Sequence, residues 1–142
     1  MHMRNMKLIL LGFSLMELLA VLVLLALMAI LVIPIYENWL IYSNRTDAIQ
    51  TLSAMQIAQE RYRLTNNTYG TLAQIWTGSS SVSGHYTLSV SNVSASAYTI
   101  TATATGKQAQ DTQNGASCAS IVLSYANNTV TKTPVACWTM GQ

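Results

Sequence analysis

The spacing of apolar residues divides the first half of the chain into two parts. From Leu18 to Tyr36 every residue is uncharged and nearly all are apolar, which matches the roughly 20 residues that a helix needs to cross a bilayer. Between Arg45 and Leu64 the apolar residues instead recur every three or four positions. This period predicts an amphipathic helix with one buried face. We therefore predict one long helix from about Phe13 to Leu64, apolar on all sides in its first half.

The amphipathic half has a stripe that we expect to be buried: Ala48, Leu52, Met55, Ala58 and Tyr62, with Ile49 beside it. The polar side chains fall on the other faces of the helix: Arg45, Asp47, Gln50, Gln56, Glu60 and Arg63. A stripe of this kind is ordinary core packing, so this half of the helix needs a partner surface.

Beyond the helix, the turn residues at 66–70 precede a loop that we expect to reach Gly84. Residues 86–91 and 98–104 then alternate between apolar residues and Ser or Thr, and residues 121–125 and 130–132 flank Asn127 and Asn128, a plausible hairpin turn. Alternation is typical of half-buried strands, and residues 111–115 look like a polar loop. We predict an α+β fold, in which the long N-terminal helix packs on an antiparallel sheet of three or four strands.

The charged residues do not change the predicted fold and point to no particular binding partner. Charged residues make up 8% of the chain, against about 25% in ordinary soluble domains. After Gly12 the positive and negative charges cancel, so the excess lies in Arg4 and Lys7, and positive charge holds that end on the cytoplasmic side of a membrane. A general affinity for nucleic acid does not follow from this balance.

Two cysteines, Cys118 and Cys137, lie in the part of the chain that we expect to be exported. In an oxidising compartment such a pair forms a disulfide, which here would close a loop of about 20 residues. The alternatives are two free thiols or a metal site. No histidine or further cysteine lies near enough in the sequence to complete a tetrahedral set of ligands.

The residues of an enzyme's active site are not apparent in the sequence. His85 is the only histidine after the first twelve residues, and we expect it at the surface. The carboxylates show no paired-acid, metal-ligand or nucleophile–base spacing, and no Gly-rich phosphate loop occurs. We therefore expect no catalysis, no cofactor and no metal.

The N-terminal residues 1–12 have a weakly basic start followed by an apolar run. A cleaved secretory signal and an uncleaved anchor are the ordinary interpretations. The run from Leu8 exceeds the about 7–15 apolar residues of a secretory signal, and no clear small-residue cleavage site follows it.

The residues 12–18, GFSLMEL, resemble the class III signal of type IV pilins and related pseudopilins. Pro34 stands where the helix-kinking proline of that family stands. The resemblance implies that a prepilin peptidase cuts between Gly12 and Phe13 and methylates the new Phe13 amine. It also makes Glu17 the acid that this family uses in assembly.

Glu17 is the only charged side chain between Lys7 and Glu37. A carboxylate in a bilayer costs about 2.5–3.5 kcal/mol near a helix centre, whereas the helix dipole returns only about 0.3–1 kcal/mol. The Phe13 amine created by cleavage would be a partner. Four helical residues rise about 6 Å, so a neighbouring subunit pairs with Glu17 more easily than its own chain does.

The resemblance further implies three parts: a leader at 1–12, a transmembrane and filament-core half helix at 13–36, and a pilin head at 37–142. The implied partners are other pilin subunits, the prepilin peptidase, the inner-membrane assembly platform and membrane lipid. The subunit would span the inner membrane once, with its N-terminus in the cytoplasm, before it enters an extracellular pilus that serves adhesion, motility or DNA uptake.

A second resemblance covers the last quarter. Residues 118–120, 132–134 and 137–138 (CAS, KTP and CW) are similar to the C-terminal region of one pilin group, in which a disulfide closes the loop before a terminal Trp. That group includes filament subunits and minor pilins, some of which are DNA-uptake receptors.

For DNA binding the candidates are Lys107 and Lys132, with Arg61 or Arg63 as further cations. Phosphate binding needs several clustered cations, and two lysines on a neutral head make a weak patch. The main prediction is therefore a structural pilus subunit. The alternatives are a minor pilin acting as a DNA receptor and a type II secretion pseudopilin, although the disulfide and the lack of an acidic Ca²⁺ loop count against the latter.

Overall fold

The computed structural model describes residues 12–139 in two units, which divide after Glu37. Helix α1 covers Leu15–Asn66 and contributes to both units, so the predicted long helix is confirmed with slightly shifted ends. The helix continues through Pro34 without interruption, although proline removes one backbone donor from a helix interior.

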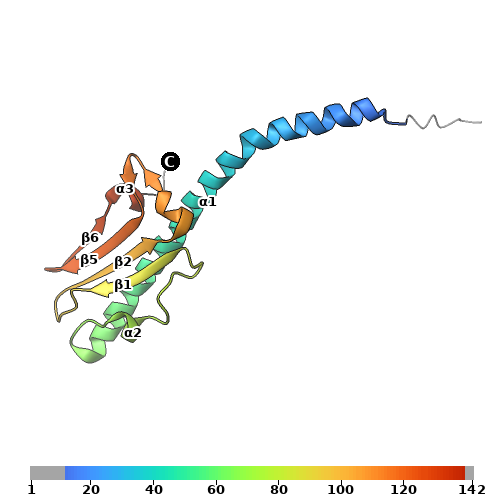
Figure 1. The fold of residues 1–142 in the computed structure, drawn as a ribbon. Helices are drawn as coiled ribbons and strands as arrows, with labels where there is room; N and C mark the ends of the chain where they lie inside the picture. The colour runs from blue at the N-terminus through green and yellow to red at the C-terminus, as the bar shows by residue number, and fades with distance from the viewer. Residues whose placement is uncertain (1–11, 140–142) are drawn as a thin grey trace, which may run out of the picture. The chain divides into compact units, whose positions relative to one another are not determined.

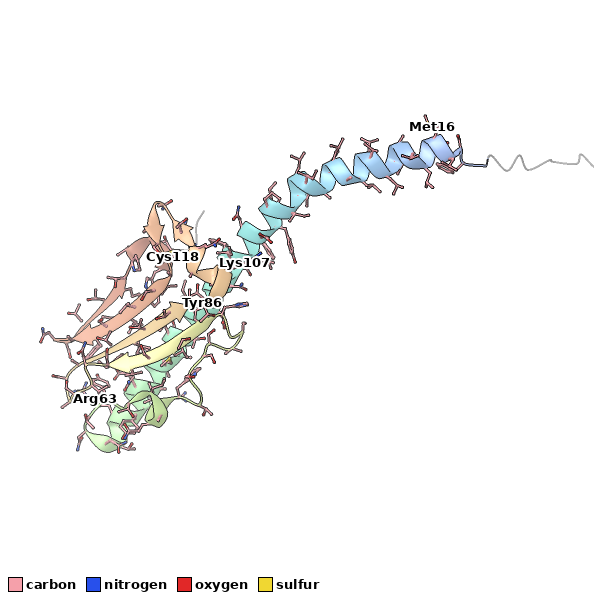
Figure 2. All side chains as sticks on the ribbon, viewed as in Figure 1. Met16, Arg63, Tyr86, Lys107 and Cys118 are labelled. Carbon is pink, nitrogen blue, oxygen red and sulfur yellow. A yellow bond between two sulfur atoms is a disulfide. The ribbon has the colours of Figure 1, made fainter. Side chains whose placement is uncertain are left out.

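The first unit consists of the apolar half of α1. Every described residue up to Leu40 is exposed, and Figure 2 shows side chains projecting on all sides of this segment. Its most apolar window has a mean hydropathy of 3.2, and none of that window is buried within the protein. Apolar surface of this extent needs a cover outside the chain. By length and composition this helix can cross a bilayer.

The second unit holds a four-stranded antiparallel sheet in the order β1-β2-β5-β6, which lies along the second half of α1 (Figure 1). Its strands are β1 (Tyr86–Ser91), β2 (Tyr98–Ala104), β5 (Ser120–Ala126) and β6 (Thr129–Thr133). The predicted α+β class and strand number are confirmed. Asn127 and Asn128 form the β5–β6 turn with positive φ angles of 51° and 63°, as a tight hairpin requires.

Two stretches expected to be loops contain short elements. Helix α2 covers Leu72–Ile75, where the Gln74 side chain accepts a hydrogen bond from the Thr71 backbone N–H at 2.8 Å and so caps the first turn. Strands β3 (Thr112–Gln113) and β4 (Ala116–Ser117) form a small second sheet. The remaining short helices are a 3₁₀ helix, η1 (Gly106–Gln110), and α3 (Val135–Trp138).

The core lies between α1 and the inner face of the sheet. Ala48, Leu52 and Met55 are fully buried as predicted, whereas Ala58 and Tyr62 are only half-buried. The fully buried apolar residues of the sheet are Tyr86, Tyr98, Ile100, Ala102, Ile121 and Leu123.

Arg45 corrects one expectation. We predicted it on a polar face, but it is buried, with 3% of its surface exposed. Its Nε donates to Asp111 Oδ2 at 2.7 Å, and its Nη2 bonds the other carboxylate oxygen. Because Asp111 lies 66 positions away, the helical pattern around Arg45 could not reveal this partner.

The predicted disulfide between Cys118 and Cys137 is confirmed, with both residues fully buried and their Cα atoms 5.6 Å apart. It joins the segment between β4 and β5 to α3. Helix α3 is thereby fastened to the segment that leads into β5.

Candidate nucleic-acid interface

Three turns gather where α1 ends: residues 66–70, the β1–β2 turn at 92–97 and the β5–β6 turn at 127–128 (Figure 1). We call this region the loop end of the head. The Tyr69 backbone N–H donates to the Ser94 carbonyl oxygen at 3.1 Å. The Tyr125 hydroxyl donates to Asn128 Oδ1 at 2.9 Å. The first bond joins the turn at 66–70 to the β1–β2 turn, and the second lies within the β5–β6 hairpin.

A cluster of three tyrosines lies beneath the loop end. The Tyr69 ring meets Tyr98 edge-on at a centroid distance of 4.6 Å and Tyr125 at 5.5 Å, and Tyr98 stacks on Tyr125 at 5.5 Å. Aromatic pairs at these separations add to the free energy of burial. The cluster therefore supports all three turns from inside.

Arg63 is bound to this cluster. Its Nη1 donates to the Tyr69 hydroxyl at 2.7 Å, and its Cζ lies 4.9 Å from the Tyr69 ring centroid. The hydrogen bond to Tyr69 raises the pKa of Arg63. Burial raises the pKa of Tyr69 to about 12, so this hydroxyl stays neutral. It donates to Glu60 Oε1 at 3.3 Å.

Arg61 differs from Arg63 in being exposed. Within residues 12–139 its guanidinium has no hydrogen-bond or ion-pair partner. A phosphate can therefore bind Arg61 without displacing an existing contact, and Arg binds phosphate well because its planar fork offers two parallel donors.

Exposed asparagines occupy the turns of the loop end. Asparagine tolerates the left-handed region better than other side-chain-bearing residues, and it occupies positive φ at each turn of the loop end: Asn67 (54°), Asn92 (52°), Asn127 (51°) and Asn128 (63°). A carboxamide can pair with the edge of adenine. This end of the head thus offers a cation and side chains of the kinds that can bind phosphate and base edges.

Lys107 lies near the other end of the sheet, and Figure 2 shows it far from Arg63. It belongs to η1, which is held by the buried Gln108. The Gln108 Nε2 donates to the Ile41 carbonyl oxygen at 2.8 Å and to the Tyr86 hydroxyl at 2.9 Å. The position of Lys107 is therefore set by α1 and β1.

Lys132 lies on β6, the edge strand, opposite Leu123. Its Nζ is 4.8 Å from the ring centroid of Trp138, a cation–π contact that orders an otherwise flexible side chain. Because Trp138 follows Cys137 directly, the disulfide also supports this lysine.

The cations of the head thus lie in separate places: Arg61 and Arg63 near the end of α1, Lys107 in η1 and Lys132 on β6. The strand β2 rises about 20 Å between the loop end and the end near η1. The outer face of the sheet between them carries hydroxyls and no charge: Thr87, Ser89, Ser91, Thr99, Thr101, Thr103, Ser120, Ser124, Thr129, Thr131 and Thr133, with only Val122 and Ala126 as exceptions. The structure does not gather Lys107, Lys132, Arg61 and Arg63 into one patch.

The residues predicted for processing and assembly lie in the first unit. Gly12 and Phe13 precede α1, Glu17 lies in its first turn, and Pro34 is inside it. The backbone N–H of Glu17 donates to the Ser14 carbonyl oxygen at 2.9 Å, so the helix is already formed at the acid. Lys7 and Arg4 lie outside the described residues.

Sequence reasoning missed the residues that position these sites. Gln59, Gln108 and the Arg45–Asp111 pair are polar and buried, which their local patterns do not indicate. Their partners are distant in sequence, and only a buried amide or charge found in the structure reveals them.

The architecture defines a class of protein. A long N-terminal helix with an uncovered apolar half, whose second half packs on a four-stranded antiparallel sheet closed by a C-terminal disulfide, is that of a type IV pilin. The chain belongs to the family described as type IV minor pilin ComP, DNA uptake sequence receptor, whose model matches residues 34–122, more than half of the chain. No curated protein matches the chain.

Proposed function

We propose that this minor pilin carries duplex DNA on its head while its apolar helix holds it in the pilus. The observation that carries this proposal is the match of the head, over residues 34–122, to a family of DNA uptake sequence receptors. The loop end supports it, because exposed asparagines occupy its turns and Arg61, exposed near the end of α1, has no partner among the described residues.

The distribution of charge suggests how DNA would lie. A duplex that follows the strands would meet Arg61 near the loop end and Lys107 about 20 Å away, with Lys132 on the edge strand between the sheet ends. The Asn side chains would contact base edges, which gives preference for a sequence rather than uniform attraction. With so few cations, phosphate contacts alone give weak binding.

The test is DNA retention by the full chain in detergent micelles as salt is raised. Each phosphate contact contributes a slope of about −0.9 in log K against log [salt]. We expect Arg61→Ala to weaken binding and to reduce this slope by about 1, and the pair Lys107→Ala and Lys132→Ala to reduce it by about 2.

Arg61→Lys is the matched control, because it keeps the charge and should keep most of the slope. The proposal would be contradicted if the wild-type chain did not bind DNA at low salt. It would also be contradicted if the alanine variants bound DNA with the same salt slope as the wild-type chain.

We further propose that the chain acts by assembly and binding, with no catalytic step of its own. Cleavage between Gly12 and Phe13 would release the leader, and the Phe13 amine would pair with Glu17 of a neighbouring subunit. The partners would be the prepilin peptidase, the inner-membrane assembly platform and other pilins. Before assembly the N-terminus would lie in the cytoplasm. The position of Glu17 at the start of an uncovered apolar helix supports this sequence of events.

A further inference from the structure

A hollow of about 490 Å³ lies between α1 and the segment that follows α2, and none of the proposed DNA contacts lines it. Its lining includes Asp47, Gln50 and Thr51 from α1, and Trp76, Val82 and Ser83 from the segment. Sites for small molecules have this range of volume and combine an apolar surface with a few convergent polar groups.

Thr51 supplies the first sign of a missing partner. Only 3% of its surface is exposed, and its hydroxyl makes no hydrogen bond within the described part of the chain. Buried hydroxyls are normally paired. Threonine in a helix populates two side-chain rotamers, so the Thr51 hydroxyl has a second direction in which it can point. A polar ligand in the hollow would thus give this hydroxyl a partner.

The charge of the hollow limits what can bind. Asp47 Oδ2 accepts a hydrogen bond from the Ser83 backbone N–H at 3.2 Å, which holds the carboxylate at the wall. Among the residues that line the hollow there is no lysine or arginine. Anions, including DNA phosphate, are therefore disfavoured, while hydroxyls find both acceptors and donors.

Trp76 gives the hollow an aromatic wall. It packs against the core and remains half-exposed, and it also lines two further hollows of about 420 and 580 Å³ along the same segment. An indole ring presents a flat, weakly negative face, which suits the C–H face of a ring that carries hydroxyls at its edge.

We propose that this hollow binds a neutral pyranose sugar. The sugar ring packs on Trp76, and its hydroxyls bond the carboxylate of Asp47, the amide of Gln50 and the hydroxyl of Thr51. This site is separate from the DNA contacts, so either can exist without the other.

The test uses the full chain in zwitterionic micelles that carry no sugar headgroup. Methyl glucoside, galactoside and mannoside are titrated by saturation-transfer NMR, with binding of at least one expected at a Kd of about 1 mM. Gln50→Ala and Thr51→Val should each weaken that binding about fivefold to tenfold, while DNA binding remains that of the wild-type chain.

Gln56→Ala, on the same helix and outside the hollow, is the matched control and should bind as the wild-type chain does. Glucuronate, the same ring with a carboxylate, should bind more weakly than the neutral sugars because of Asp47. No binding of any neutral pyranoside, equal binding by all variants, or tighter binding of glucuronate would overturn the proposal.

Discussion

At Gln59 one side chain holds the reversal of the chain after α1. The residue is fully buried, its Nε2 donates to the Gly70 carbonyl oxygen at 2.7 Å, and its Oε1 accepts the Gly70 N–H at 2.8 Å. The amide thus satisfies both backbone groups of a buried residue, as a neighbouring strand would. Gly70 is needed there, because a Cβ would lie 2.7 Å from Ile75 Cγ2.

We predict that Gln59→Leu destabilises the head by about 2–4 kcal/mol, since each buried group left unpaired costs about 1–3 kcal/mol. Denaturant unfolding of the full chain in micelles measures the loss. Gln56→Leu, one turn away and half-buried, is the control and should change stability by less than about 1 kcal/mol. Equal effects of the two substitutions would contradict this role.

The buried hydroxyl of Tyr86 makes the stability of the head depend on pH in the alkaline range. It is fully buried and its hydroxyl accepts a hydrogen bond from Gln108, and burial raises its pKa to about 12. An unfolded tyrosine ionises near pH 10. The contribution of the neutral Tyr86 hydroxyl to the stability of the folded state is therefore complete below about pH 10 and is lost as the pH rises toward 12.

We expect the denaturant concentration at the unfolding midpoint to decrease as the pH is raised from about 10 to 12. Tyr86→Phe should make this decrease smaller, because the variant has one ionisable hydroxyl fewer. Chemical unfolding across that range is the measurement. An unchanged pH profile in Tyr86→Phe would show that the Tyr86 hydroxyl does not control alkaline unfolding.

At the scale of elements, the Arg45–Asp111 pair fastens the segment between β2 and β5 to α1. Both side chains are almost fully buried, and the hydrogen bond to Asp111 raises the pKa of Arg45. Arg45 Nη1 also donates to Gln113 Oε1 at 2.9 Å. The same segment carries Lys107 and leads to Cys118, whose backbone N–H donates to the Asp111 carbonyl oxygen at 2.8 Å.

We predict that Asp111→Ala costs about 3–5 kcal/mol, because it leaves a buried guanidinium without its counter-charge. The double variant Arg45→Met and Asp111→Leu should recover most of that loss, since apolar residues of similar volume can replace a buried pair. Thermal unfolding measures both. A double variant that is as unstable as the single one would show that the pair contributes more than charge compensation.

For the whole molecule, the apolar half of α1 and the charge of Glu17 belong together. The helix exposes its apolar side chains on all sides, and in the proposed filament its surroundings would be other apolar helices. A carboxylate in such surroundings needs a cation, and removal of one partner from a buried pair costs about 3–5 kcal/mol.

We predict that Glu17→Gln leaves the head folded and inserted in the membrane but lowers incorporation into pili by about tenfold or more. Mass spectrometry of sheared pili and of membranes gives the two amounts, and the same spectra reveal whether the chain begins at a methylated Phe13. Glu37→Gln, beyond the apolar run, is the control. Normal incorporation of the Glu17 variant would rule out the proposed pairing.

The helix and the strands could be predicted because their signals are local. The run from Leu18 to Tyr36, the three-and-four spacing of Ala48, Leu52 and Met55, and the alternation from Tyr98 to Ala104 each repeat within a few residues. The candidate interface was only partly predictable. The cations could be named from the sequence, but their spread over both ends of the sheet and its edge strand follows from strand length and order.

The sequence by itself determined the membrane-length helix and the α+β head, because the spacing of apolar residues repeats within a few positions. It favoured the disulfide, which the structure then showed. Only the tertiary structure decided that Arg45 is buried against Asp111, that Gln59 holds Gly70 and that Arg61 is left without a partner. These outcomes depend on which groups meet across many residues. The free energy of a buried polar group depends on that partner, and no local pattern records it.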